Sequence, residues 1–78
     1  IKTIECANGN VRIKKNQEFE ETEIALSEAE IRDVVKKFSE MTKIPIADNV
    51  LRATLNNFRI VAIISDKIGS RFLIQKIS

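Results

Sequence analysis

The chain has 78 residues, of which 44% are hydrophobic and 31% are charged, so it is long enough for one small domain with a thin core. It contains no histidine, one cysteine and two glycines, which excludes an internal disulfide and argues against a Cys/His metal site, a Ser-His or Cys-His nucleophile and a glycine-rich phosphate loop. The formal net charge of +2 is too small to indicate nucleic-acid binding by itself.

Three short strands are predicted in the first third of the chain, over residues 1–7, 11–15 and 19–26. Ile4 and Cys6 lie on one face of the first strand, and the other two alternate apolar with polar residues, which is the two-residue period of a half-buried strand. The Asn8-Gly9 pair predicts a tight hairpin turn, because both residues tolerate positive φ. Residues 18–23 carry four glutamates, so we expect the third strand to begin as an exposed edge.

A helix is predicted after Ser27, which suits the N-cap position and completes a capping box with Glu30. Pro45 disfavours helical geometry at the residue before it, so the helix is expected to end near residues 42–44. We interpret Met41 as core filler at the end of the apolar stripe of this helix. The stripe recurs at helical spacing and consists of Ile31, Val34, Val35, Phe38 and Met41.

Three further strands are predicted in the last third of the chain. An Asn56-Asn57 turn separates the first two, and a short loop carrying Gly69 separates the last two. Residues 60–64 and 72–74 are apolar without alternation, which is typical of strands covered on both faces. Since one helix covers one face only, we expect the other face to be covered by the rest of the chain, by a missing part of the protein or by a partner.

These elements predict an α+β fold in the order β-β-β-α-β-β-β. We expect a small mixed or antiparallel sheet of about six strands with one main helix, similar to a PAS domain in architecture. The chain begins without an initiator methionine and ends in a strand-like run, so residues 1–78 are expected to be a single domain cut from a longer protein. The lone cysteine, the lack of a signal-peptide pattern and the lack of a long apolar run predict a cytoplasmic location.

Most candidate functional side chains are expected to be structural. Cys6 is interpreted as a small core residue rather than a reactive thiol. The carboxylates are interpreted as a solvated surface rather than a glycosidase-like pair. The four phenylalanines are interpreted mainly as core residues rather than stacking platforms for bases, since tyrosine and tryptophan are absent; they are Phe19, Phe38, Phe58 and Phe72. The chain itself is therefore not expected to be an enzyme.

Basic residues are the remaining candidates for a binding site. For most of them a solubilising surface charge is the simpler interpretation; the candidates are Arg12, Lys14, Lys15, Arg52, Arg59, Lys67, Arg71 and Lys76. Arg59 differs, because it stands just beyond a tight turn and before a buried-type run, at the rim of the predicted sheet. Its planar guanidinium is the side-chain group best suited to bind phosphate.

Several short segments, taken in order, resemble the N-terminal domain of secretion-superfamily ATPases. These are the motors of type II and type IV secretion, of type IV pili and of the archaeal flagellum. Residues 11–14 look like the return strand of the first hairpin of that domain, residues 30–42 like its helix and residues 42–46 like the connector that follows. Residues 52–60 look like its arginine hairpin, and residues 69–76 look like its closing strand.

This resemblance implies a non-catalytic regulatory and assembly domain. It would pack over the nucleotide of a P-loop ATPase domain in the same chain and against neighbouring subunits of a hexameric ring. ATP and Mg²⁺ would be bound by the P-loop domain, and no cofactor by residues 1–78. Inner-membrane secretion components would be further partners, which gives a cytoplasmic location peripheral to the membrane.

The resemblance also implies which residues would contact the nucleotide phosphates. Arg59 matches the arginine after the hairpin turn, and Lys76 matches the lysine of the closing strand. Thr54 and Gln75 stand where the family has further arginines, so this chain would bind phosphate with fewer charges. Two nearby residues, Arg52 and Arg71, are substitute candidates.

Two other functions remain open from the sequence. A stand-alone nucleic-acid-binding module is supported by the basic hairpin residues and by a sheet face that is left exposed. The low net charge and the absence of tyrosine and tryptophan argue against it, and no nucleic-acid partner is favoured. A PAS-like sensor of a small ligand would need dedicated ligand residues, and the sequence shows none.

Overall fold

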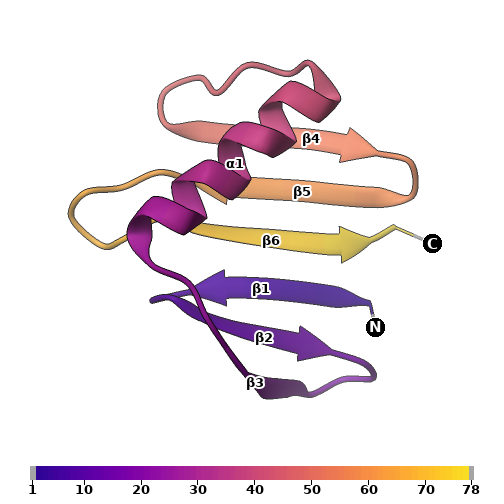
Figure 1. The fold of residues 1–78 in the computed structure, drawn as a ribbon. Helices are drawn as coiled ribbons and strands as arrows, with labels where there is room; N and C mark the ends of the chain where they lie inside the picture. The colour runs from indigo at the N-terminus through magenta and orange to yellow at the C-terminus, as the bar shows by residue number, and fades with distance from the viewer. Residues whose placement is uncertain (1, 78) are drawn as a thin grey trace.

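The computed structural model describes residues 2–77 as a six-stranded antiparallel sheet with one helix lying diagonally across one face (Figure 1). The strand order is β3-β2-β1-β6-β5-β4, which confirms the predicted α+β class and the predicted order of elements. The elements are β1 (Thr3–Ala7), β2 (Asn10–Lys14), β3 (Phe19–Ala25), α1 (Glu28–Thr42), β4 (Val50–Leu55), β5 (Phe58–Ile63) and β6 (Arg71–Lys76). The first strand is shorter than predicted, and Ile1 lies outside the described residues.

The predicted turn between β1 and β2 is confirmed. Asn8 and Gly9 both have positive φ, at 56° and 79°, which gives the backbone twist that a tight hairpin needs. A residue with a side chain would also clash at position 9, because a Cβ atom on Gly9 would lie 2.8 Å from the carbonyl oxygen of Leu26. The amide of Leu26 donates to the carbonyl of Gly9 at 2.7 Å, so this turn also holds the end of β3.

Strand β3 is an exposed edge strand, as its glutamates predict. It pairs with β2 alone, and the register shifts between Asn10 and Arg12. The hydroxyl of Thr22 donates to the carbonyl of Val11 at 2.6 Å. Ile24 is 56% exposed, so the expected apolar alternation fails at this residue, whereas Leu26, directly after the strand, packs against the core. The irregular pairing and the negative charge both protect this edge from pairing with another strand.

Helix α1 begins and ends where the sequence predicts. The Ser27 hydroxyl accepts from the amide of Glu30 at 3.1 Å, and the Glu30 carboxylate accepts from the amide of Ser27 at 2.9 Å. These bonds complete the capping box, and the bond from the Ser27 amide is the larger cause of the lowered pKa of Glu30. Lys43 ends the helix in the left-handed conformation, with φ of 59°.

The apolar stripe of α1 is buried for most of its length. Ile31 and Val35 are fully buried, and Phe38 packs edge-on against Phe72 of β6 with 5.9 Å between the ring centroids. The interpretation of Met41 as core filler is wrong, because this side chain is 60% exposed. The helix crosses the sheet at an angle, and its last turn reaches the β4 edge (Figure 1), which agrees with the exposure of Met41 in that turn.

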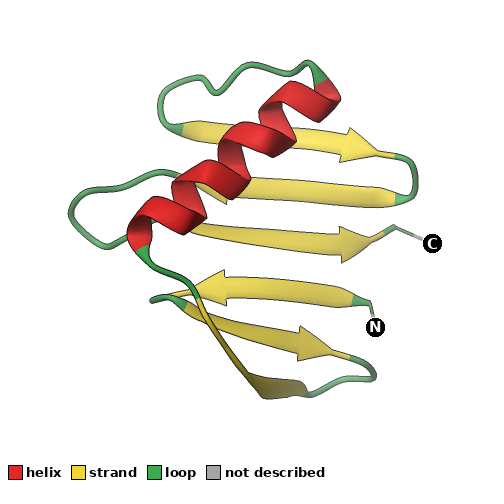
Figure 2. Cartoon of the chain, viewed as in Figure 1, coloured by secondary structure: helices red, strands yellow, loops and turns green. Residues whose placement is uncertain are grey.

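A network at the start of α1 attaches the loop between β5 and β6. The Glu28 carboxylate accepts from the amide of Ser70 at 2.8 Å and from its hydroxyl at 2.5 Å, while Ser70 itself is 1% exposed. Arg32 pairs with Glu28 and also with Asp66 of the same loop. The bond from Arg32, followed by those from Ser70, lowers the pKa of Glu28 to about 2. This loop and the one before β4 are the two long connections of the fold (Figure 2).

Residues that are paired across an antiparallel sheet point to the same face. On the face that carries α1, Cys6 is fully buried, as predicted, and burial is the main cause of the raised pKa of its thiol. The buried core on this face consists of Cys6, Val11, Leu51, Ala53, Ile60, Ala62 and Phe72.

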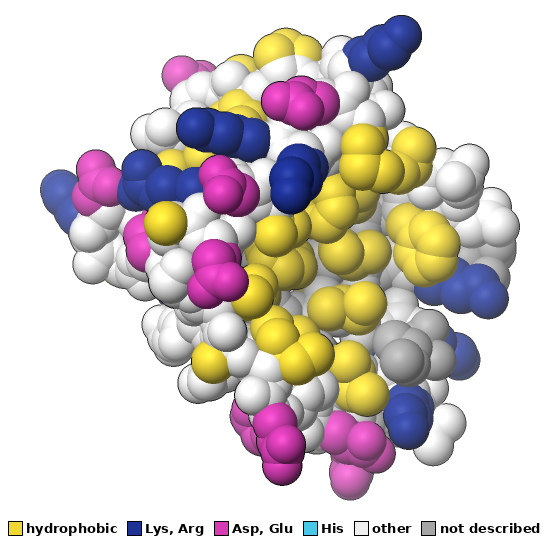
Figure 3. Space-filling view, in the orientation of Figure 1, with side chains coloured by type: hydrophobic (Ala, Val, Ile, Leu, Met, Phe, Trp, Pro, Cys, Tyr) yellow, Lys and Arg dark blue, Asp and Glu magenta, His cyan; other side chains and the backbone are white. Residues whose placement is uncertain are grey.

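Helix α1 leaves part of this face accessible. Hydrophobic side chains gather in a band beside it (Figure 3). Phe58 is 42% exposed, and Ile4, Ile13 and Ile74 are half-buried. Phe19, at 39%, is exposed on the opposite face. The core interpretation of the phenylalanines is therefore confirmed for Phe38 and Phe72 and is wrong for the other two.

The second face of the sheet is not covered by any element of residues 2–77, and we call it the open face. Val61 and Leu73 are half-buried on it, and Ile63 is 36% exposed. Strands β5 and β6 thus carry apolar side chains on both faces, but only the face toward α1 is covered. The side chains that the strand pairing assigns to the open face are Thr3, Glu5, Ala7, Asn10, Arg12, Lys14, Phe19, Glu21, Ala25, Val50, Arg52, Thr54, Arg59, Val61, Ile63, Arg71, Leu73 and Gln75.

The one helix of residues 2–77 has 15 residues and many charged side chains, so it is too short and too polar to cross a bilayer.

Candidate functional site

Arg52 and Arg59 lie together on the open face. Arg59 is the second residue of β5, directly after the turn in which Asn56 has φ of 54°. It lies opposite Thr54, and Arg52 lies opposite Val61 in the same hairpin. The two arginines are therefore diagonal neighbours on adjacent strands, within reach of long side chains. Both are exposed, and both line one shallow hollow of about 720 Å³.

This hollow has no acidic side chain in its lining, which consists of Ile44, Arg52, Ala53, Thr54, Arg59, Ile60 and Val61. Among residues 2–77 the ion pairs involve Arg12 and Arg32 and no other basic residue. The guanidinium groups of Arg52 and Arg59 thus have no carboxylate partner in the described part of the chain. Such groups are available for a charge-assisted, bidentate contact with a phosphate or a carboxylate.

Arg71 lies on the open face at the other end of β6. It is four residues from Gln75, which is paired with Arg59, so roughly 14 Å separates the Cα atoms of the two arginines at about 3.4 Å per residue. Its Nε atom is buried and has no hydrogen-bond partner among the described residues. One Nη atom lies 3.5 Å from the carbonyl oxygen of Ile68, at the limit of a hydrogen bond.

Lys76 does not lie with the three arginines. It is paired with Phe58, whose side chain is on the face that carries α1. The four residues expected to contact phosphate are therefore divided among three places. Arg52 and Arg59 share one hollow, Arg71 lies at the far end of the same face, and Lys76 lies on the opposite face.

The open face collects most of the net positive charge. Among the residues that the strand pairing assigns to this face, five are basic and two are acidic, out of 13 basic and 11 acidic residues in the chain. The basic members are Arg12, Lys14, Arg52, Arg59 and Arg71, and the acidic members are Glu5 and Glu21. The overall charge of +2 conceals this distribution, because the rest of the chain carries slightly more acidic than basic side chains.

The β1–β2–β3 half of the open face differs from the β4–β5–β6 half. Glu5 lies opposite Arg12 and forms an ion pair with it, and the hydrogen bond between them is the main cause of the raised pKa of Arg12. The Phe19 ring lies 4.6 Å from the Arg12 Cζ and 5.4 Å from the Lys14 Nζ, measured to the ring centroid. These two cations are therefore partly satisfied within the domain, whereas Arg52, Arg59 and Arg71 have neither a carboxylate nor an aromatic partner among residues 2–77.

The position of Phe19 beneath two cations is the feature that the sequence did not reveal. A two-residue alternation carried through the β2–β3 connection places Arg12 and Lys14 on one face and Phe19 on the other. The four-residue connection instead brings Phe19 opposite Lys14, so the three side chains share a face.

No group of three or more metal-ligating side chains occurs within residues 2–77. A scan of the chain against protein-family models, a search of curated proteins and a search of solved structures gave no match.

Proposed function

We propose that this domain is a non-catalytic regulatory and assembly module that packs its open face over the nucleotide of a P-loop ATPase domain. The parent would be a motor of type II or type IV secretion, or of pilus or archaeal flagellum assembly. The observation that carries the proposal is the juxtaposition of Arg52 and Arg59 in one hollow without a neighbouring carboxylate. An anion from outside the domain, such as a nucleotide phosphate, would then neutralise these two guanidinium groups.

The residues of the hollow indicate which part of nucleotide binding this domain would supply and which part the P-loop domain would supply. It offers two guanidinium groups on a rigid hairpin but no glycine-rich loop to hold phosphates. The P-loop domain would supply that loop, the Mg²⁺ and the residues that orient the attacking water. The arginines would add charge-assisted hydrogen bonds of about 1.5–3 kcal/mol each when the two domains close, so closure would depend on the nucleotide state.

Two further features support this proposal. The order of elements agrees with the order expected from the resemblance. The open face also exposes Val61, Ile63 and Leu73, and strands of this character are typically covered on both faces. An element from outside residues 2–77 would provide that cover. ATP and Mg²⁺ would be held in that domain, in a ring on the cytoplasmic side of the inner membrane.

The test is ATP turnover by the longer protein that carries this domain, compared between wild type and Arg59→Ala. We expect turnover to fall about tenfold, at the lower end of the range for a charge-assisted contact because Arg59 is exposed. Lys67→Ala, a basic residue in the β5–β6 loop, is the matched control and should leave turnover unchanged. Normal turnover in the Arg59 variant, or a parent sequence without a Walker A motif, would reject the proposal.

A stand-alone nucleic-acid-binding module is the second candidate, and the Phe19 ring beneath Arg12 and Lys14 favours it. Aromatic rings and cations on one sheet face are typical of surfaces that bind single strands. Titration of the isolated domain with a single-stranded oligonucleotide separates the two functions. Binding that weakens steeply with salt, and that is lost in Phe19→Ala, would favour this second function.

A further inference from the structure

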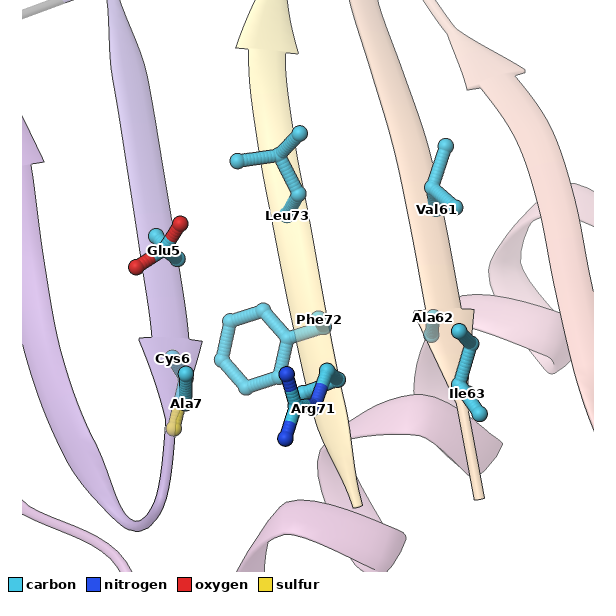
Figure 4. Close-up of a pocket in the computed structure, with 9 residues that line it drawn as sticks. All are labelled: Glu5, Cys6, Ala7, Val61, Ala62, Ile63, Arg71, Phe72 and Leu73. Atoms are coloured by element: carbon cyan, nitrogen blue, oxygen red, sulfur yellow. The ribbon is translucent and has the colours of Figure 1, made fainter. Parts of the chain in front are cut away.

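A second hollow on the open face is separate from the one that holds Arg52 and Arg59. It has a volume of about 160 Å³ and lies over strands β1, β6 and β5. Figure 4 shows its lining, with the Arg71 guanidinium leaning from β6 toward β1. The side chains that the open face contributes are mostly aliphatic: Ala7, Val61, Ile63 and Leu73, with Glu5 and Arg71 at the margins.

Arg71 is the polar group of this hollow. Its Nε is buried without an acceptor among the described residues, and its contact with the Ile68 carbonyl is long, at 3.5 Å. The side chain as a whole is only half-buried and has no carboxylate partner among the described residues, so its guanidinium can still accept an anionic partner from outside the domain. The guanidinium selects an anionic acceptor, and a carboxylate matches its two parallel donors.

The charges around the hollow define the occupant further. The open-face residues of β4, β5 and β6 include three arginines and no carboxylate. Glu5, the nearest acidic side chain, is already paired with Arg12. A second copy docked through the same face would set arginines against arginines, which disfavours a symmetric dimer. A phosphate backbone would satisfy Arg71 but would leave Val61, Ile63 and Leu73 against polar groups.

The shape of the surface favours a helix. Strands β1, β6 and β5, which line the hollow, together span about 10 Å at ~4.8 Å between neighbours, which is close to the ~10 Å diameter of an α-helix. Helix α1 already contacts β4 and β6 on the other face. A second helix on the open face would complete a three-layer arrangement and would explain why β5 and β6 are apolar on both faces.

We propose that the open face binds an amphipathic helix of a partner protein, with an apolar stripe flanked by carboxylates. The stripe packs on Val61, Ile63 and Leu73, and one flanking carboxylate binds Arg71. This inference rests on the open face being the docking surface, as in the proposed function, but it does not require contact with a nucleotide.

The experiment titrates the ¹⁵N-labelled domain with two synthetic helical peptides of about 15 residues, long enough for a stable helix when stapled. Both peptides carry leucines along one face; one has glutamates on both flanks and the other has lysines. The glutamate peptide should shift the amide resonances of Val61, Ile63, Arg71 and Leu73 in a saturable way. The lysine peptide should not shift them.

Variants then assign the two parts of the contact. Arg71→Ala should weaken binding of the glutamate peptide at least tenfold, and Ile63→Ser should weaken it while keeping the charges. Lys36→Ala, an exposed residue of α1, should leave binding unchanged. If the spectrum of the free Arg71→Ala variant keeps the dispersion of the wild type, the loss of binding is not due to unfolding. If that variant does unfold, Ile63→Ser still tests the contact independently.

Four outcomes would overturn the inference. They are equal binding of both peptides, shifts confined to the band beside α1, tighter binding of a single-stranded oligonucleotide to the same residues, and self-association of the domain through this face. The inference and the proposed function fail separately. A lost peptide contact with an intact effect of Arg59→Ala on turnover rejects the helix alone, and the reverse pattern rejects the nucleotide contact alone.

Discussion

Arg59 of β5 lies directly opposite Gln75 of β6, and its other cross-strand neighbour is Thr54 of β4. These two neighbours are the positions at which the resemblance to secretion ATPases would place arginines. The three positions form one row across the open face. The row carries one cation, Arg59, between two neutral side chains that can donate hydrogen bonds.

Adding a second cation to this row should strengthen anion binding. Gln75→Arg places a second guanidinium beside that of Arg59, so we expect pyrophosphate to bind the isolated domain about tenfold more tightly, as one added charge-assisted hydrogen bond predicts. Isothermal titration calorimetry at low salt measures the change. Ile77→Arg, at a residue beyond the end of β6, adds the same charge outside the row. An equal gain in both variants would show a general charge effect and no defined site.

The stability of the domain should depend on pH through Glu28. The folded state lowers the pKa of Glu28 to about 2 from the ordinary value of 4.5, so its contribution is fully present above pH 4.5 and is lost as the pH falls toward 2. We expect Glu28→Gln to be less stable than wild type at neutral pH and to lose less stability on acidification. Thermal unfolding at several pH values measures both. Glu23→Gln, on the exposed edge strand, is the control and should follow the wild-type curve.

The two glycines should differ in their tolerance of alanine. Both have positive φ, at 79° for Gly9 and 83° for Gly69, so either substitution costs about 1–2 kcal/mol for the left-handed conformation. Only at Gly9 does the new Cβ meet backbone, 2.8 Å from the Leu26 carbonyl oxygen, whereas the nearest atom at Gly69 is 3.9 Å away. Gly9→Ala should therefore lower the free energy of unfolding by more than Gly69→Ala, as measured in urea. Equal losses would contradict the close approach at the first turn.

The helix stripe should be energetically uneven. Ile31 is 2% exposed and Met41 is 60% exposed, although both belong to the same sequence pattern. We expect Ile31→Ala to cost about 2–5 kcal/mol and Met41→Ala to stay within about 0.5 kcal/mol. Urea denaturation of both variants provides the comparison. A large loss in the Met41 variant would mean that the last turn of α1 is packed in solution.

Local signals predicted the elements well. The capping box at Ser27, the Asn8-Gly9 turn and the acidic third strand each act over a few residues, and the structure confirms each of them. The fate of Met41 depends instead on the angle at which α1 crosses the sheet. That angle is set by packing among elements distant in sequence, and no local pattern reports it.

The site was predictable in part. The two-residue turn at Asn56-Asn57 fixes the register that brings Arg52 and Arg59 together. Lys76 is five residues from Arg71, an odd number, so simple alternation already assigns the two to opposite faces. The unsatisfied Nε of Arg71 could not be foreseen, because its burial comes from neighbours on β1 and β5 and the pairing of β1 with β6 has no local signal.

That pairing of β1 with β6 also governs how the chain folds. The β1–β2–β3 and β4–β5–β6 halves each consist of sequential neighbours, but the two halves meet only where the first strand joins the last. The amide of Lys76 donates to the carbonyl of Lys2 at 2.8 Å. Forming the β1–β6 pair closes the longest loop of this topology and so costs the most loop-closure entropy. We therefore expect this step to limit the folding rate. A circular permutant that links Ile77 to Lys2, and opens in the loop between α1 and β4, has the strand order β4-β5-β6-β1-β2-β3, so every strand pairs with its sequential neighbour. It should fold faster than the natural order.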